Sequence, residues 1–242
     1  MTLPDIQQIY DVVDGTWPAA SYQQLGPWLI REGAGGGQRV SAATATQPIT
    51  AEDIPQAEAA MQALGQPKLF MIREGDDALD ALLGAQGYVV HDPVKAYACP
   101  IEILTQESAP RITALLAWEP LAIMLDIWAK GGVNAGRIDV MHRAKGPKTG
   151  FIGRLNDHPA ATGFCAIHDG IAMVHALEVL PHQRRQNMAR YAMLELAQWA
   201  QENGATHMSL VTTQANAGAN ALYTSLGMTC VGQYHYRLKK ES

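Results

Sequence analysis

The sequence has little cysteine and fewer basic than acidic residues, and each shortage excludes some classes of protein. Its 242 residues include three cysteines, Cys99, Cys165 and Cys230, which lie far apart and form no CxxC pair. This number and spacing fit neither a disulfide framework nor a zinc site, and we expect reduced thiols in a cytoplasmic protein. Eighteen Lys and Arg against twenty-three Asp and Glu give a net charge of −5. A basic stripe that would neutralise nucleic-acid phosphates is missing, so we expect no nucleic-acid partner. The cysteine pattern leads us to expect no metal.

Long apolar runs are also missing. The first residues carry an acid at Asp5 and no basic region followed by an apolar run, so they do not resemble a secretory signal. The most apolar stretch, residues 112–128, is interrupted by Glu119, Pro120 and Asp126, and it is too short to span a bilayer. Hydrophobic residues still make up 48% of the chain. We therefore expect a cytoplasmic protein with a sizeable core and no membrane partner.

The length accommodates two domains of roughly 100–140 residues each. Residues 105–111 are polar and contain Pro110, which makes them the best candidate linker. We therefore predict domains at residues 1–104 and 110–242. A helix, a glycine and a strand at residues 79–97 are matched by the same order at 219–236. Two related domains would explain this repeat, and chance similarity of two capped amphipathic helices is the alternative.

Hydrophobic periodicity and turn residues predict a mixture of helices and strands. The predicted helices cover residues 4–14, 53–64, 77–85, 112–128 with a possible break at Pro120, 135–143, 187–201 and 217–226. The predicted strands cover residues 28–30, 40–45, 69–73, 88–90, 94–104, 150–154, 161–168, 171–179, 206–213 and 228–238. The glycine-rich run at 33–37 lacks the Lys-Ser/Thr of a phosphate loop, so a hairpin turn is the preferred interpretation.

One strand-to-helix junction carries the strongest functional signal. An apolar strand ends at Val179-Leu180, Pro181 stops it, and a basic turn leads into a long amphipathic helix. Free backbone N–H groups and the positive end of the helix dipole then point at one spot, which suits a phosphate group. Arg184 and Arg185 add positive charge there, unless they are only a solvated helix start.

Two motifs at and after this junction resemble a known family. Val179-Leu180-Pro181 followed by Arg184-x-x-Asn187-x-Ala189 resembles the Q/R-x-x-G-x-G/A signature of the GCN5-related N-acetyltransferase (GNAT) superfamily. Its second signature is similar to Asn216-x-x-Ala219-x-x-Leu222-Tyr223-x-x-x-Gly227-Met228. The resemblance covers about residues 110–240. It implies an α+β (mixed α/β) GNAT fold, with a central mixed, mostly antiparallel sheet flanked by helices.

The resemblance also implies acetyl-CoA as cosubstrate. The main chain of residues 185–190 would grip the pyrophosphate, and the main chain near Val179 would pair with the pantetheine arm. Asn187 replaces the first glycine of the signature, and asparagine is the next most tolerant residue for left-handed backbone. The coenzyme-binding residues implied in this way are Val179, Arg184, Arg185, Gln186, Asn187, Met188, Ala189, Arg190, Asn216 and Ala219.

Acyl transfer to an amine needs a base, because a primary amine near pKa 10 is mostly protonated at neutral pH. The strand His175-Ala176-Leu177-Glu178-Val179 resembles that of the arylalkylamine acetyltransferase branch, whose histidine is assigned to proton removal. His175 is our first choice of base, and Glu178 and water are the alternatives. Three positions apart, His175 and Glu178 should face opposite sides of an extended strand. The position of the base glutamate in other branches is Met173, which cannot serve.

Tyr223 is the expected acid. A phenol near the thioester can assist the departing thiolate, whose pKa is about 8.5. Tyr223 stands in the second motif, where the resemblance places it beside the thioester together with Asn216. The alternative is an aromatic residue of the core.

The whole resemblance implies an N-acetyltransferase that moves an acetyl group to an amine of a small molecule or peptide by direct attack in a ternary complex. A non-catalytic CoA-binding regulatory module and a longer acyl group are alternatives. The acceptor amine stays unidentified, and a homodimer is possible. Residues 17–19, residues 26–31 and Arg39 resemble the first domain of certain two-domain bacterial GNAT proteins, a degenerate copy that does not bind coenzyme. We expect this half to wall one side of the acceptor pocket or to stiffen the fold.

Overall fold

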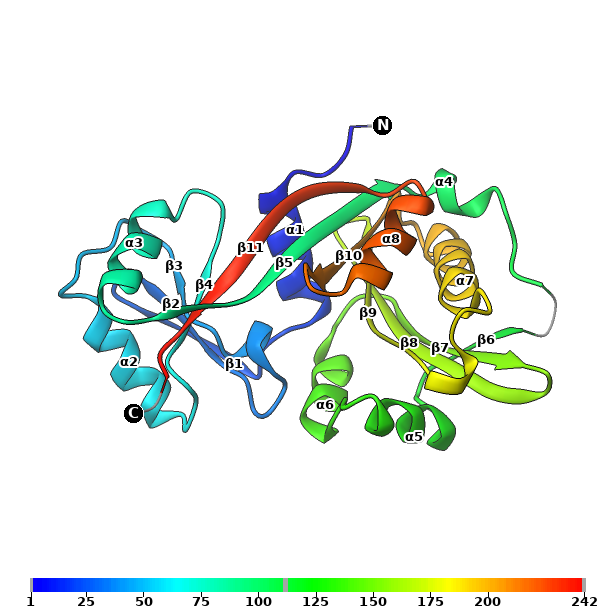
Figure 1. Ribbon diagram of the computed structural model, residues 1–242, viewed down its shortest axis with the longest axis horizontal. Coiled ribbons are helices and arrows are strands. Elements are labelled where there is room, and N and C mark those ends of the chain that lie inside the picture. The colour runs from blue at the N-terminus through cyan, green and yellow to red at the C-terminus, as the bar shows by residue number, and fades with distance from the viewer. Residues whose placement is uncertain (1, 111–112, 241–242) are drawn as a thin grey trace.

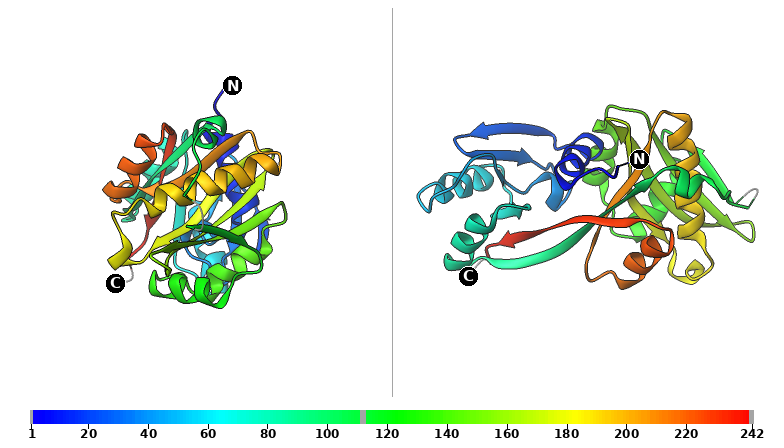
Figure 2. Two further views of the ribbon diagram at one scale, coloured as in Figure 1. Left: turned by 90° about the vertical axis from the view of Figure 1, so that its right-hand side faces the viewer. Right: turned by 90° about the horizontal axis from the view of Figure 1, so that it is seen from above.

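The computed structural model describes residues 2–110 and 113–240, which form two lobes joined by two long strands (Figure 1). The long strands are β5 (Val89–Pro100) and β11 (Thr229–Leu238), and they pair antiparallel with each other. Seen from above, both run from one lobe into the other (Figure 2). The two lobes are therefore built on a common sheet.

This sheet has the strand order β4-β11-β5-β10-β9-β8-β7-β6. Its other strands are β4 (Leu69–Ile72), β6 (Ala114–Ala117), β7 (Lys148–Leu155), β8 (His158–His168), β9 (Ile171–Val179) and β10 (His207–Thr213). Neighbours pair antiparallel except β9 and β10, which are parallel. The predicted mixed, mostly antiparallel sheet is confirmed.

The order of the strands interleaves the two halves of the chain. β5 belongs to the first half, yet it lies between β10 and β11 of the second. β11 in turn pairs with β4 of the first half. The helix, glycine and strand that repeat in the sequence are α3 (Asp77–Ala85), Gly87 and β5, and α8 (Ala217–Ser225), Gly227 and β11. The two repeated strands are neighbours, so the sequence division at residues 104–110 does not divide the sheet.

Helices cover both faces of the second half of this sheet. On one face lie α4 (Glu102–Thr105), α7 (Met188–Glu202) and α8, whose apolar side chains share a core with Phe151, Cys165 and Val174. On the other face lie α1 (Ile6–Thr16), α5 (Ala122–Lys130) and α6 (Ala135–Arg143). This layering confirms the predicted sheet flanked by helices.

The first lobe has its own small sheet and core. A three-stranded sheet is formed by β1 (Ser21–Leu25), β2 (Trp28–Glu32) and β3 (Thr44–Ala45). The helix α2 (Ile54–Ala63) packs against β2. Trp28, Phe70 and Leu83 are fully buried at its centre. The glycine-rich run forms a turn, closed by a bond from the Gly36 N–H to the Gly33 carbonyl (2.8 Å), ahead of the short helix η1 (Gln38–Val40).

Three predicted elements are wrong. The strand predicted at residues 40–45 is present only as the two-residue β3, which follows the short helix η1. Residues 114–117 form strand β6 at the sheet edge instead of the start of a helix, and the helix begins only at Ala122, after Pro120. A short apolar run has no period that separates strand from helix. The predicted pair of strands at 88–90 and 94–104 is the single strand β5. Pro93 is accommodated because a bulge at this point leaves two residues opposite His235.

Candidate active site

The candidate site lies where β9 and β10 part. The two parallel strands pair only along residues 171–174 and 207–210. Beyond that point β9 contains a bulge: its register with β8 shifts, and Ala176 takes a φ of 48°. The indole Nε1 of the buried Trp128 donates to the Ala176 carbonyl (2.8 Å) and holds the bulge in place.

The bulge changes which residues share a face. His175 pairs with Phe164 of β8 and Glu178 pairs with Thr162, two residues away. Because every second residue of β8 points the same way, His175 and Glu178 lie on one face of the sheet. The expectation that they face opposite sides is wrong, since it assumed a regular strand.

A cavity of about 690 Å³ opens at the start of α7 and beside α8; we term it the α7–α8 cavity. Most of the sequence-predicted coenzyme residues line it, namely Val179, Arg184, Arg185, Asn187, Met188, Ala189, Arg190, Asn216 and Ala219. Tyr223 lines it as well. Gln186 is not part of the lining, and its side-chain amide donates to Gln183 Oε1 (3.2 Å).

The rim of this cavity is shaped to accept an anion. Arg185 and Asn187 both take left-handed backbone, with φ of 60° and 62°, immediately before α7. A turn with such residues can direct successive backbone N–H groups at one point; we term this turn the nest, and the helix dipole adds positive potential there. Asn187 adopts the conformation for which glycine is preferred. These observations fit the pyrophosphate of a coenzyme.

Tyr223 is 8% exposed and packs against the ring of Tyr97, with ring centroids 5.9 Å apart. Burial raises the pKa of Tyr223 to about 12, so its hydroxyl is protonated at neutral pH. Within residues 2–110 and 113–240, nothing forms a hydrogen bond with that hydroxyl. The phenol is therefore a free donor at the cavity wall.

His175 is held in a chain of hydrogen bonds. The Thr16 hydroxyl donates to the Val12 carbonyl (2.6 Å), so Thr16 Oγ1 must accept from His175 Nε2 (2.8 Å). The other ring nitrogen, Nδ1, accepts from Arg39 Nη1 (3.0 Å). The imidazole is 3% exposed and lies against Trp17. Burial and, secondarily, the charge of Arg39 lower the pKa of His175 well below its usual value, which leaves the ring neutral with both nitrogens engaged.

A second cavity, of about 290 Å³, lies between the lobes; we term it the inter-lobe cavity. Its lining joins Trp17 and Arg39 from the first half to Arg137 of α6 and Glu178 of β9. Glu178 lines the α7–α8 cavity too. Burial raises the pKa of the Glu178 carboxyl, against the lowering effect of Arg184 and Arg137. A carboxylate with increased basicity thus stands between the two cavities.

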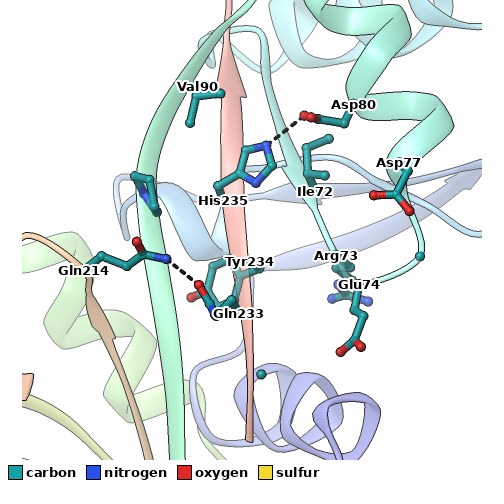
Figure 3. Close-up of a pocket in the computed structure, with 13 residues that line it drawn as sticks. Ile72, Arg73, Glu74, Asp77, Asp80, Val90, Gln214, Gln233, Tyr234 and His235 are labelled. Carbon is teal, nitrogen blue, oxygen red and sulfur yellow. Dashed lines mark hydrogen bonds and ion pairs between the residues drawn. The ribbon is translucent and has the colours of Figure 1, made fainter. Parts of the chain in front are cut away.

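A third cavity, of about 430 Å³, lies between β4, the start of α3 and β11 (Figure 3). Asp80 in its wall accepts from His235 Nε2 (2.8 Å), and Gln214 Nε2 donates to Gln233 Oε1 (2.6 Å). This cavity shares Tyr234 with the inter-lobe cavity and no residue with the α7–α8 cavity.

Two features often tied to function are missing from the part of the chain that the structure describes. No group of three or more His, Cys, Asp or Glu side chains there is arranged to hold a metal ion. No helix among these residues has the length and apolar character needed to cross a membrane.

The arginines of the inter-lobe cavity were not predicted as site residues. Arg39 was noted only within a pattern of the first half, and Arg137 reads as one of several polar residues on a short helix. Local sequence carries no signal that these two side chains meet, since only the packing of the lobes brings them together.

Comparison with known proteins identifies acetyltransferases as similar to this chain. Residues 117–228 match the Acetyltransferase (GNAT) family, and this range holds all the predicted site residues. The uncharacterized N-acetyltransferase YobR of Bacillus subtilis (strain 168) is 26% identical over 248 residues, which is 98% of this chain and 100% of that protein.

Solved structures agree on the fold. A GCN5-related N-acetyltransferase from Kribbella flavida aligns with a TM-score of 0.70 at 20% identity, over 97% of this chain and 95% of the other. A tandem GNAT protein from the clavulanic acid biosynthesis pathway aligns with a TM-score of 0.60 at 11% identity, over 83% and 76%. The predicted resemblance is confirmed for residues 117–228, which match the GNAT family of acetyltransferases, and solved GNAT structures share the fold of the chain.

Proposed function

We propose that the protein is an acetyl-CoA-dependent N-acetyltransferase that acts on a small amine by direct attack in a ternary complex. The observation that carries this proposal is the position of Glu178, which lines both the α7–α8 cavity and the inter-lobe cavity. A base for the amine must reach both substrates, and a carboxyl with a raised pKa meets that need.

On the coenzyme side, acetyl-CoA supplies an activated acyl carbon and a thiolate leaving group. The nest at Arg185 and Asn187 is proposed to hold its pyrophosphate, and the end of β9 near Val179 to pair with its pantetheine arm. Tyr223 supports the departing sulfur by donating a hydrogen bond. Its pKa of about 12 favours this role over full proton transfer to a thiolate.

On the acceptor side, the amine enters the inter-lobe cavity as an ammonium ion. Glu178 takes one proton, and the neutral nitrogen attacks the thioester carbon. The new C–N bond forms, the nitrogen loses its second proton to solvent, the C–S bond breaks, and the sulfur leaves as thiolate, which is protonated by solvent. His175 has no free lone pair for this task, so we assign it the positioning of Arg39. We further propose that Trp17 and Arg39, which line the inter-lobe cavity, make the first half one wall of the acceptor site.

The test is release of CoA thiol, with mass spectrometry of the product, when the intact protein meets acetyl-CoA and a panel of primary amines. We expect acetylated amine in proportion to thiol released. Butyryl-CoA in a parallel arm distinguishes an enzyme for longer acyl groups. A protein that binds acetyl-CoA tightly yet acetylates no amine would contradict the proposal and favour a coenzyme-binding regulatory module.

A further inference from the structure

We propose that the acceptor is an amine that also carries a carboxylate, of the size of an amino acid, and that Arg39 and Arg137 bind this carboxylate. The inference rests on the proposed function, because it names the substrate class of the same site. It starts from the two guanidinium groups that line the inter-lobe cavity, one from each half of the chain.

The two arginines lack an internal counterion. In the described ranges 2–110 and 113–240, no carboxylate oxygen lies within 4 Å of either guanidinium group. They are nevertheless close to each other, since the charge of Arg39 lowers the pKa of Arg137, second only to burial. Two neighbouring cations in a recess of a chain with net charge −5 create a local positive potential that attracts an anion.

Arg39 is fixed before any ligand arrives. Its Nη1 donates to His175 Nδ1 (3.0 Å), and its guanidinium carbon lies 5.1 Å from the centre of the Trp17 ring. His175 is itself anchored on Thr16. A planar guanidinium held in this way matches the two oxygens of a carboxylate, and little side-chain entropy is lost on binding.

The charges of the cavity match a molecule with both signs. Glu178 lies close enough to Arg137 for its charge to act on that arginine, although no oxygen–nitrogen contact within 4 Å joins them. An ammonium group directed at Glu178 would leave the anionic end of a short molecule at the arginines. Asp92 also lines the cavity. Its Oδ2 lies 3.4 Å from His91 Nε2, and it forms no ion pair with either arginine among the described residues.

The rest of the lining fits a small organic side chain. Tyr234, Tyr236 and Val94 contribute ring and aliphatic surface to the wall. The volume, about 290 Å³, is at the small end of the range for ligand sites. An amino acid with an aromatic or aliphatic side chain fits this chemistry, whereas a polyamine would place positive charge against two arginines.

The first experiment uses the unaltered protein and three matched acceptors: phenylalanine, phenylalaninamide and phenethylamine. We expect kcat/KM for phenylalanine to exceed that of the other two at least tenfold, which is the loss from one unpaired charged contact of about 1.4 kcal/mol. Equal rates for the three amines, or faster reaction of the two without a carboxylate, would overturn the inference while leaving the proposed function intact. No thiol release with any amine would contradict the proposed function itself.

The second experiment compares Arg137→Gln with Arg154→Gln, a control in an exposed pair with Asp157 (3.3 Å). We expect Arg137→Gln to raise the KM for phenylalanine at least tenfold, to lower kcat/KM for phenethylamine far less than kcat/KM for phenylalanine, and to leave the KM for acetyl-CoA unchanged. The control should match the parent protein in all three quantities. Equal losses for both acceptors and for acetyl-CoA would indicate structural damage and speak against a carboxylate site. If Arg137→Gln does not fold, the comparison of acceptors still decides the question.

Discussion

At the scale of single residues, His175 and Glu178 on β9 have pKa values shifted in opposite directions. Burial raises the pKa of Glu178, which makes its carboxylate a better base than an exposed one. Burial and Arg39 lower the pKa of His175, which keeps the imidazole neutral and its Nδ1 lone pair engaged. Both groups lie on one face of the sheet, yet only Glu178 reaches the α7–α8 cavity.

We therefore predict that Glu178→Gln lowers kcat by roughly 10²- to 10⁴-fold, the usual contribution of a general base. In the parent protein, kcat/KM should rise with pH through the raised pKa of Glu178, since the ionised carboxylate is the active form. The variant should lose this rise, which is the acidic limb of the pH profile of kcat/KM. It should keep its affinity for acetyl-CoA, measured by calorimetry. Persistence of the limb in Glu178→Gln, together with its loss in His175→Gln, would return the role of base to His175.

Tyr223→Phe tests the donor to the sulfur. The substitution keeps the ring that packs against Tyr97 and removes one hydrogen bond to a developing charge, worth about 1.5–3 kcal/mol. We expect kcat to fall roughly 10- to 150-fold, with acetyl-CoA affinity unchanged. Tyr97→Phe is the control, because the Tyr97 hydroxyl donates to Asn220 Oδ1 (2.9 Å) and Tyr97 does not line the cavity. Equal rates for Tyr223→Phe and the parent protein would remove Tyr223 from the mechanism.

At the scale of elements, the start of α7 depends on one left-handed residue. Asn187 takes φ 62°, a conformation that a β-branched side chain adopts only at a cost of about 1–2 kcal/mol. We predict that Asn187→Val raises the Kd of acetyl-CoA roughly 5- to 30-fold, because the nest is distorted. Asn187→Gly is the matched control, and it should bind as well as the parent protein. An unchanged Kd in both variants would mean that the coenzyme does not use this nest.

Several elements could be predicted from the sequence because their ends carry local signals. The bounds of α6 and β9 agree with the predicted 135–143 and 171–179. α6 begins after Asn134, whose side chain accepts from the Arg137 N–H (3.0 Å), a typical helix start. The bulge of β9 has no such signal, since alanine is an unusual residue for positive φ and Ala176 gives no warning of it.

The same distinction separates the two sides of the site. The proposed coenzyme side is made by one continuous stretch and by α8, so the two motifs predict its lining from local sequence. The proposed acceptor side, the inter-lobe cavity, unites Arg39, Arg137 and Glu178, which are far apart in sequence and come together only through strand exchange and lobe packing. Local patterns do not encode such long-range pairing, and for that reason the arginine pair escaped prediction.

At the scale of the whole molecule, the interleaved strands should make the two lobes one cooperative unit. Removal of residues 1–104 would take both β4 and β5, which leaves β11 without a partner strand and β10 with an unpaired edge. We therefore expect residues 110–242 alone to be insoluble or unfolded. A soluble, fully active fragment would contradict both this expectation and the proposed role of the first half in the acceptor site.

Asp80 tests the connection between the two halves of the chain without removing a strand. Its carboxylate on α3 accepts from Arg237 Nε (2.7 Å) and Nη2 (3.0 Å) of β11, and from His235. Arg237 is the main cause of the lowered pKa of Asp80. Because the pKa is lower folded than unfolded, the stabilisation is present above the ordinary carboxyl pKa and is lost as pH falls through the lowered value.

Asp80→Asn should therefore reduce the free energy of unfolding by about 1–2 kcal/mol at neutral pH, with a difference that shrinks in acid. Urea unfolding followed by tryptophan fluorescence and by circular dichroism measures this difference. The two probes should report a single shared transition, because Trp28 packs against Phe70 of β4 and Trp128 donates to the Ala176 carbonyl of β9, and both strands belong to the eight-stranded sheet. Asp157→Asn, in an exposed turn, is the control and should leave the midpoint unchanged. Two separate transitions in Asp80→Asn would show that the lobes fold independently despite their shared strands.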